Sequence, residues 1–133
     1  MTLTVDRTIS AAERPLDGPL LTFDVPALLT QLKREHAWQT GSRNGITLLK
    51  TDALRVVLVA MHAGTTIPVH KAEGPLAVEV VDGQMVFSAG AQDVSLGEGQ
   101  LLTLHAEMPH GLHAITDCSF LLTIAGEAPH PVE

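Results

Sequence analysis

The stretch that decides the fold is residues 64–83, GTTIPVHKAEGPLAVEVVDG, and it is completed by residues 99–114, GQLLTLHAEMPHGLHA. Each stretch opens with a glycine; the first carries His70, and the second carries His110 together with His105 and His113. His70 and His110 each lie near the edge of an apolar, strand-like run. The pair Asp82-Gly83, which stands between two apolar runs, is a strong local signal for a β-hairpin turn. These patterns predict a β-rich domain in which any chemistry depends on the two histidines.

Short apolar runs separated by turn residues occur on both sides of these stretches. They predict strands at residues 46–50, 54–61, 76–81, 84–88, 92–96, 101–105, 112–116 and 119–125. Many short strands at this spacing are typical of an all-β sandwich or barrel. Before the strands, Asp24 is a good helix N-cap and apolar residues recur at helical spacing after it, which predicts a helix over residues 25–36.

The chain is therefore expected to consist of an N-terminal arm (residues 1–23), a helical segment (24–40), a barrel (41–126) and a loose C-terminal tail (127–133). A length of 133 residues fits one domain with an ordinary core. The arm carries Pro15 and Pro19, which disfavour a long helix or a central strand there.

The composition argues against several classes of partner. A net charge of −7 and eight scattered basic residues argue against nucleic acid, because phosphate binding needs clustered Lys and Arg. No apolar run approaches the roughly 20 residues that span a bilayer, and the N-terminus lacks the pattern of a secretion signal. Cys118 is the one cysteine, so no intrachain disulfide can form. We expect a cytoplasmic protein that binds neither nucleic acid nor membrane.

The two opening stretches resemble the two signature motifs of the cupins. The first family motif is Gly, five residues, His-x-His, three or four residues, Glu, six residues and Gly; Gly64, His70 and Gly83 fall on its places. The second is Gly, five residues, Pro-x-Gly, two residues, His, three residues and Asn; Gly99 and His110 match it. The spacing between the motifs is that of small bacterial cupins. The resemblance implies a jelly-roll barrel, the double-stranded β-helix of RmlC-like cupins, preceded by one N-terminal α-helix.

The resemblance also implies what has happened to the family's metal site. In metal-binding cupins, two histidines and a glutamate of the first motif and the histidine of the second hold one divalent metal. Here His70 and His110 remain, but Ala72 and Leu76 replace the other two ligands. A site for iron, manganese or zinc needs at least three protein ligands. We therefore expect no cofactor, or a divalent metal at low occupancy on His70 and His110, with Glu73 as the candidate third ligand.

Strand alternation places a set of mainly apolar side chains with the two histidines inside the barrel. The expected ligand pocket consists of His70, Ala72, Leu76, Val78, His110, Leu112 and Ala114. Glu79 and His113 have the opposite parity and should face outward, whereas the directions of His62 and His105 stay open. No catalytic residue can be assigned.

Three functions remain open from the sequence. The first is binding of a small, mainly apolar molecule in the barrel, with little or no metal. The alternative is a metal-dependent cupin enzyme of dioxygenase or isomerase type that uses His70, His110 and a nonstandard third ligand. The third is a structural dimer with a filled barrel. A homodimer is expected in any case, because barrels of this family commonly pair and the arm has the composition to lie along a partner's sheet edge.

Overall fold

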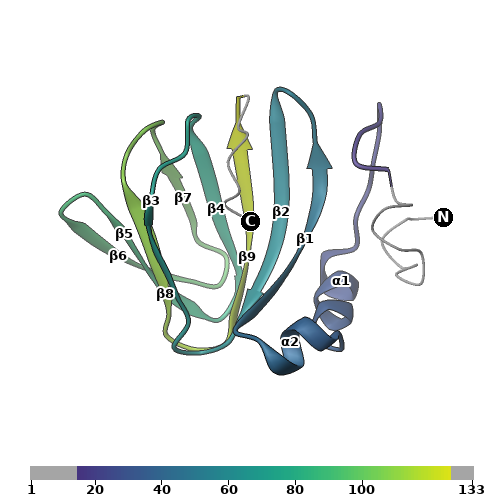
Figure 1. Cartoon of the computed structure of the whole chain (residues 1–133), viewed down its shortest axis with the longest axis horizontal. Helices are drawn as coiled ribbons and strands as arrows, with labels where there is room; N and C mark the ends of the chain where they lie inside the picture. Colours follow the sequence, from purple (N-terminus) through teal and green to yellow (C-terminus); the bar gives the residue numbers. More distant parts are fainter. Residues whose placement is uncertain (1–14, 127–133) are drawn as a thin grey trace.

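Two antiparallel sheets face each other across an apolar interior, and two short helices cover the outer face of the larger one (Figure 1). The computed structural model describes residues 15–126, so residues 1–14 of the expected arm and the expected tail, 127–133, lie outside the described residues. The five-stranded sheet has the order β1 (Arg43–Lys50), β2 (Leu54–Met61), β9 (Cys118–Ala125), β4 (Leu76–Asp82) and β7 (Leu101–Leu104). The four-stranded sheet has the order β3 (Thr66–His70), β8 (His110–Ala114), β5 (Gln84–Ala89) and β6 (Gln92–Gly97).

This arrangement confirms the predicted all-β jelly-roll architecture. The strand missing from the sequence-based prediction is β3, which contains Pro68. Proline lacks the N–H that a central strand needs, but β3 is an edge strand that pairs with β8 on one side, so this loss costs no sheet hydrogen bond. Strand β1 begins at Arg43 instead of residue 46, and β8 begins at His110 instead of residue 112.

The predicted helical region is present, but one helix over residues 25–36 was wrong in extent. Helix α1 (Val25–Leu32) begins at the predicted N-cap, where the Asp24 carboxylate accepts a 3.0 Å hydrogen bond from the Ala27 N–H. It ends at Leu32, and a second helix, α2 (His36–Thr40), follows. The break arises because Glu35 has an extended backbone and the Asn44 side chain donates to the Leu32 carbonyl oxygen at 2.9 Å. The chain thereby turns so that Trp38 on α2 is buried against the sheet.

Apolar side chains form a separate cluster on each face of the five-stranded sheet. One cluster fills the space between the two sheets, with Val57 and Val59 of β2 among its members. The other joins the two helices to the outer face of β1 and β2 and includes Trp38, Leu58 and Ala60. Because both faces of β2 are covered, its sequence LRVVLVAM is almost continuously apolar.

The described end of the arm lies beside its own sheet. The N–H of Lys50, at the end of β1, donates a 2.8 Å hydrogen bond to the carbonyl oxygen of Leu16. Residue 16 therefore lies against the edge of β1 in the same chain, at the outer strand of the five-stranded sheet.

Neither helix in residues 15–126 is long and apolar enough to cross a membrane.

Candidate functional site

A cavity of about 370 Å³ lies between the two sheets. Side chains from both sheets line it: Arg43, Asn44, Gly45, Ile46, Thr47, Val57, Val59, Ile67, His70, Leu76, Val78, Phe87, His110, Leu112, Phe120 and Leu122. Most of these side chains are aliphatic or aromatic, none is acidic, and the volume is in the range of small-molecule sites. The cavity can therefore accept a small molecule whose surface is mainly apolar.

His70 and His110 form one polar wall of this cavity. They are paired across the β3–β8 ladder, and their ring centroids are 4.5 Å apart with the ring planes tilted by 60°. His110 is buried, and its ring also stacks on Phe87 with a centroid distance of 5.6 Å. His70, on the edge strand, is half-buried. The two imidazoles are thus close enough to contact the same small molecule.

The backbone fixes the same tautomer in both rings. The Nδ1 atom of His70 lies 2.8 Å from the Pro68 carbonyl oxygen, and Nδ1 of His110 lies 2.9 Å from the Met108 carbonyl oxygen. A carbonyl oxygen only accepts, so each Nδ1 must carry the proton. In the neutral rings, each Nε2 is then a hydrogen-bond acceptor. Burial lowers the pKa of His110, opposed by its bond to the Met108 carbonyl and reinforced by the charge of His70, so the neutral form is favoured.

The loop before β8 places His110 at the cost of backbone strain. Glu107 has φ = 68°, a left-handed conformation that non-glycine residues rarely adopt. Its N–H donates a 2.9 Å hydrogen bond to the carbonyl oxygen of Ala72, on the loop that follows β3. This bond joins the loop that follows His70 to the loop that precedes His110. Glu107 stands at the glycine place of the second cupin motif, which explains why the backbone has this conformation there.

Five of the seven pocket residues expected from the sequence line the cavity: His70, Leu76, Val78, His110 and Leu112. Ala72 and Ala114 are buried in the same apolar cluster without lining it. Ala114 lies at the other end of β8, where its backbone bonds to residues 64 and 65. The small side chains at these two positions therefore belong to the packed interior and do not enlarge the cavity.

The residues present fall short of a complete metal site. His70 and His110 supply two nitrogen donors, whereas the expected third ligand, Glu73, has an exposed side chain. Within residues 15–126, no three His, Cys, Asp or Glu side chains are grouped so that they could hold a metal ion. The structure therefore does not bring Glu73 together with the two histidines, and two ligands are fewer than these metals require.

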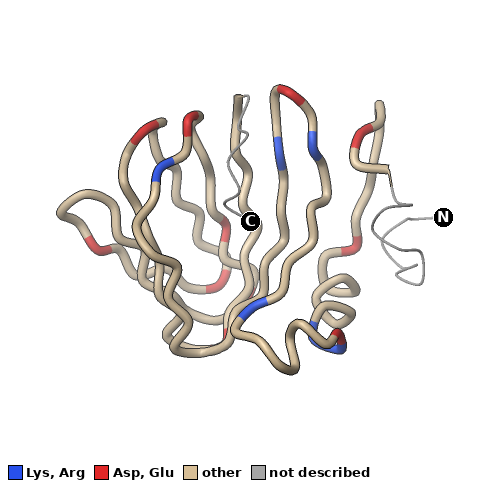
Figure 2. Tube along the Cα trace, viewed as in Figure 1, with Lys and Arg blue, Asp and Glu red and all other residues tan. Residues whose placement is uncertain are grey.

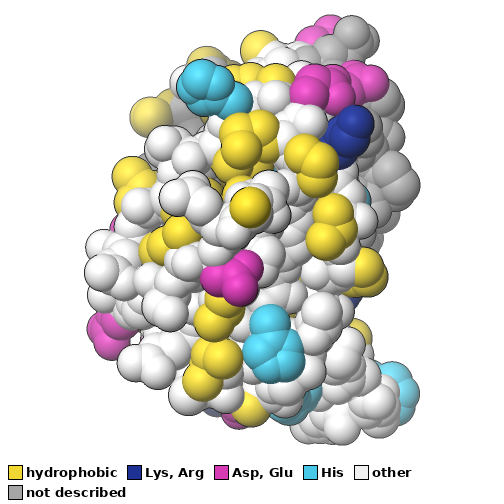
Figure 3. Space-filling view, turned by 90° about the vertical axis from the view of Figure 1, so that its left-hand side faces the viewer, with side chains coloured by type: hydrophobic (Ala, Val, Ile, Leu, Met, Phe, Trp, Pro, Cys, Tyr) yellow, Lys and Arg dark blue, Asp and Glu magenta, His cyan; other side chains and the backbone are white. Residues whose placement is uncertain are grey.

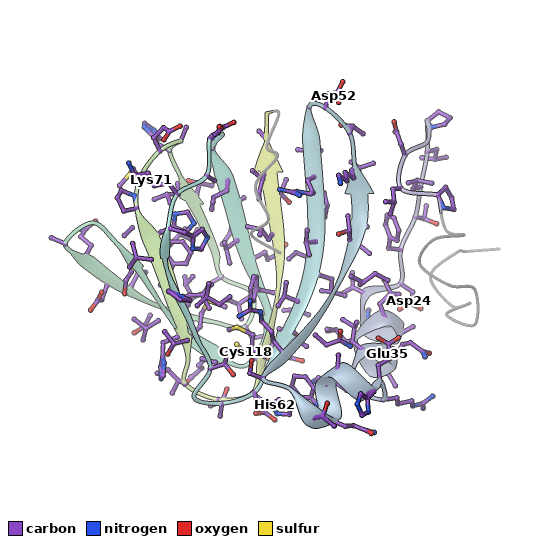
Figure 4. The ribbon with its side chains drawn as sticks, in the orientation of Figure 1. Asp24, Glu35, Asp52, His62, Lys71 and Cys118 are labelled. Carbon is purple, nitrogen blue, oxygen red and sulfur yellow. The ribbon has the colours of Figure 1, made fainter. Side chains whose placement is uncertain are left out.

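Glu79, His62, His105 and His113 do not line the cavity. Glu79 is exposed, and His113 is exposed on the outer face, where its Nδ1 lies 2.7 Å from the Thr66 hydroxyl. His62 stacks on Trp38 with ring centroids 3.5 Å apart, and its Nε2 donates to the Trp38 carbonyl oxygen at 2.8 Å. Figure 4 shows His62 beside α2, at the opposite end of the barrel from Lys71. His105 is exposed.

Sequence reasoning missed the contribution of β1 to the cavity. Arg43, Gly45 and Thr47 alternate with Ile46 and Leu48, which pack toward the helices. Strand β1 was predicted to begin at residue 46, so its polar start was assigned to a loop. The alternation of polar residues with Ile46 and Leu48 is the signal that would have found this side of the site.

Cys118 takes no part in the cavity wall. It is buried at the start of β9, in agreement with the expectation of a small apolar residue (Figure 4). Burial raises the pKa of the Cys118 thiol to about 11, and the carboxylates of Asp82 and Asp117 act in the same direction. A thiol that stays protonated is a poor nucleophile.

Comparisons with known proteins place the fold. No protein-family model matches the chain, and no curated protein matches it. Among solved structures, a conserved protein of unknown function from Streptococcus pyogenes matches at 18% identity and a TM-score of 0.66, over 84% of this chain and 92% of that one. An RmlC-like cupin protein from Desulfovibrio desulfuricans matches at 29% identity and a TM-score of 0.58, over 63% of this chain and 82% of that one.

A salicylate 1,2-dioxygenase from Pseudaminobacter salicylatoxidans matches at 16% identity and a TM-score of 0.60, over 63% of this chain but 26% of that one. At that identity the likeness concerns the fold. The two motif histidines, the two-sheet topology and the solved structures agree with one another. The fold of this chain is that of a small cupin.

Proposed function

We propose that this protein binds a small, mainly apolar molecule in the cavity between its two sheets. The observation that carries the proposal is the cavity itself: about 370 Å³, walled by aliphatic and aromatic side chains, with two imidazoles converging on one part of its wall. An apolar pocket with a few convergent polar groups is the usual form of a small-molecule site. Burial of the ligand's apolar surface provides the affinity, and the histidines orient its polar group.

The test uses methyl NMR spectra of the full chain during titration with octan-1-ol. The methyl signals of lining residues such as Val78 and Leu112 are expected to shift and to saturate. Replacing Ile67, which lines the cavity from β3, by Trp should abolish the shifts by filling the space. The matched control is Val69→Trp on the same strand, because Val69 is 68% exposed and does not line the cavity.

A saturable shift that survives in Val69→Trp and disappears in Ile67→Trp supports the proposal. Signals that do not move at millimolar octan-1-ol, or that move equally in both variants, contradict it. Far-UV circular dichroism of both variants establishes that the added indole has not unfolded the barrel.

A metal-dependent reaction is the second candidate, favoured by one observation. In both histidines the Nδ1–H donates a hydrogen bond to a backbone carbonyl oxygen, so each Nε2 atom keeps a free electron pair. The centroids of the two rings are 4.5 Å apart. Metal-ligating histidines are commonly oriented by such a bond from the other ring nitrogen. An incoming substrate would have to supply the metal ligands that the described residues do not. Elemental analysis of the dialysed protein tests this candidate.

A further inference from the structure

Besides the two histidines, the cavity is lined by the Arg43 guanidinium, together with the uncharged polar residues Asn44 and Thr47. Arg43 lines the cavity at the start of β1, and its side chain is exposed. Among the lining residues it is the one with a permanent charge, and none of them is Asp or Glu. Within residues 15–126 its side chain makes no hydrogen bond or ion pair. A protein of net charge −7 thus presents an unneutralised cation to its cavity.

The neighbouring polar side chain is already engaged. The Asn44 amide nitrogen donates to the Leu32 carbonyl oxygen at 2.9 Å and to a Glu35 carboxylate oxygen at 3.0 Å, and its amide oxygen accepts from the Gly45 N–H. Asn44 therefore holds β1 to the helices, and both of its amide hydrogens are already used. Arg43 is the charged residue at this end of the cavity that can recognise a polar group of a ligand.

Arg43 and the histidine pair lie toward opposite ends of the barrel. The carbonyl oxygen of Ser42, next to Arg43, accepts hydrogen bonds from the His62 N–H at 3.0 Å and from the Thr65 hydroxyl at 3.1 Å. This is the end where β3 begins, and His70 is at the other end of that strand, next to Lys71 (Figure 4). Four strand steps separate Thr66 from His70, a span of about 13 Å.

The two polar ends of the cavity can bind different chemical groups. Arg43 recognises an anion, and its guanidinium fits the two oxygens of a carboxylate best. The Nε2 atoms of His70 and His110 are acceptors in the neutral rings and therefore require a donor, such as a hydroxyl group. Between these ends the cavity wall is aliphatic and aromatic.

Resting on the proposed function, we infer that the ligand is an amphipathic carboxylic acid with a hydroxyl group at its far end. Its carboxylate pairs with Arg43, its hydrocarbon body occupies the apolar cavity, and its hydroxyl donates to Nε2 of His70 or His110. An entirely apolar ligand would leave Nε2 of the buried His110 without a donor and would make no use of the Arg43 charge.

Three probes with the same eight-carbon chain separate these contributions: octan-1-ol, octanoate and 8-hydroxyoctanoate. Dissociation constants are measured by calorimetry on the full chain, with the methyl signals of the cavity reporting the site. Arg43→Gln should weaken octanoate binding about fivefold, near the upper limit for an exposed ion pair. It should leave octan-1-ol almost unaffected. The matched control is Arg34→Gln, which removes the same charge from an exposed arginine that does not line the cavity.

The histidine end is tested on the same probes. The native chain should bind 8-hydroxyoctanoate about fivefold more tightly than octanoate, the effect of one satisfied hydrogen bond. His70→Phe should remove this preference, and His113→Phe, a change on the outer face, should keep it.

The outcomes distinguish this inference from the function on which it rests. The inference is overturned if octanoate affinity falls equally in Arg34→Gln and Arg43→Gln. It is also overturned if Arg43→Gln lowers the affinity for octan-1-ol as much as that for octanoate. Either result leaves the proposal of cavity binding intact. The same holds if 8-hydroxyoctanoate gains nothing over octanoate in the native chain. If none of the three probes shifts the cavity methyl signals, the proposed function fails and the inference fails with it.

Discussion

The N–H of Glu107 donates a hydrogen bond to the carbonyl oxygen of Ala72 at 2.9 Å, across the gap between the loop before β8 and the loop after β3. Ala72 follows His70 by two residues, and Glu107 precedes His110 by three. This backbone bond therefore adds to the β3–β8 pairing that sets the two cavity histidines beside each other. It forms while Glu107 has φ = 68°, so the strained conformation is part of the site's construction.

Replacing Glu107 by Gly should stabilise the protein. Glycine adopts φ = 68° without the roughly 1–2 kcal/mol cost of a left-handed L-residue, although its freer unfolded chain offsets part of this gain. We expect the free energy of unfolding in urea to rise by about 0.5–1 kcal/mol. Glu98→Gly is the control, because Glu98 lies in a turn without positive φ and should gain nothing. Equal effects in both variants would contradict the assignment of strain to Glu107.

At Gly111, β8 lies close to the backbone of β3. A Cβ atom there would lie 2.8 Å from the Ile67 carbonyl oxygen, and backbone cannot move aside as a side-chain end can. Gly111→Ala should therefore destabilise the fold by about 1–3 kcal/mol and push β3 outward. Gly90→Ala tests the contrast, because a Cβ at Gly90 meets nothing within 4 Å and the cost there is conformational. A Gly111→Ala protein with native stability and unchanged β3 amide shifts in NMR would refute this role.

His110 should titrate below the ordinary histidine value of 6.5, because burial lowers its pKa and the charge of His70 adds to this effect. The measurement is an NMR pH titration of the His110 ring. In His70→Phe the midpoint should rise, since the neighbouring charge is gone. Below pH 6.5 the unfolded chain binds the proton more readily than the native one, so the free energy of unfolding falls as the pH decreases. A midpoint at or above 6.5 contradicts the prediction.

Metal should not be tightly held at the histidine pair. Losing outer support of a metal ligand alone costs about 10- to 100-fold in affinity, and here two direct ligands are replaced by Ala72 and Leu76. Elemental analysis after dialysis should give well below one equivalent of iron, manganese, nickel or zinc. One retained equivalent would show the prediction wrong and favour the metal-dependent reaction. Its loss in Glu73→Ala would then identify Glu73 as a ligand after a loop rearrangement.

We also predict a homodimer. Figure 3 shows hydrophobic side chains spread over the face of the four-stranded sheet, and Val69, Val94 and Ile115 are among the exposed ones. Lys and Arg are sparse on this side of the chain trace (Figure 2). Light scattering at micromolar concentration should give the mass of two chains, and Val69→Lys should reduce it. A chain without residues 1–14 tests the arm separately, and a monomer in the native protein contradicts pairing.

Periodicity and turn residues were enough to predict the jelly roll, because most strands pack one face against an apolar interior, and β4, β5, β6 and β9 end at or next to a glycine. They failed for β3, since Pro68 is tolerated there only through the strand's edge position, which is a property of the assembled sheet. They also extended the first helix too far. The break at Leu32 depends on Asn44, twelve residues away in sequence.

Part of the candidate site could likewise be predicted from local sequence, and part could not. The histidine pair follows from motif spacing and strand alternation, both local properties of the chain. The exclusion of Ala72 and Ala114 from the cavity wall depends on how the loops close over them, and the exposure of Glu73 depends on a loop conformation. Arg43 belongs to the site because β1 starts three residues earlier than predicted. It starts there because residues 43–45 pair with the end of β2, where Arg43 is the partner of Met61. Local pattern does not contain that information.

The two walls of the cavity differ in stiffness. The wall made by β1 and β2 is clamped from behind by α1 and α2 through Leu58, Ala60 and Trp38, so a displacement there would open a second apolar cluster. The opposite wall is not backed by the helices and ends in β3, whose ladder with β8 is interrupted between Ile67 and His70. We therefore expect β3, and not β1 or β2, to move when a bulkier ligand enters the cavity. Arg43 thus belongs to the wall that the helices support, whereas His70 belongs to the wall that ends in an edge strand.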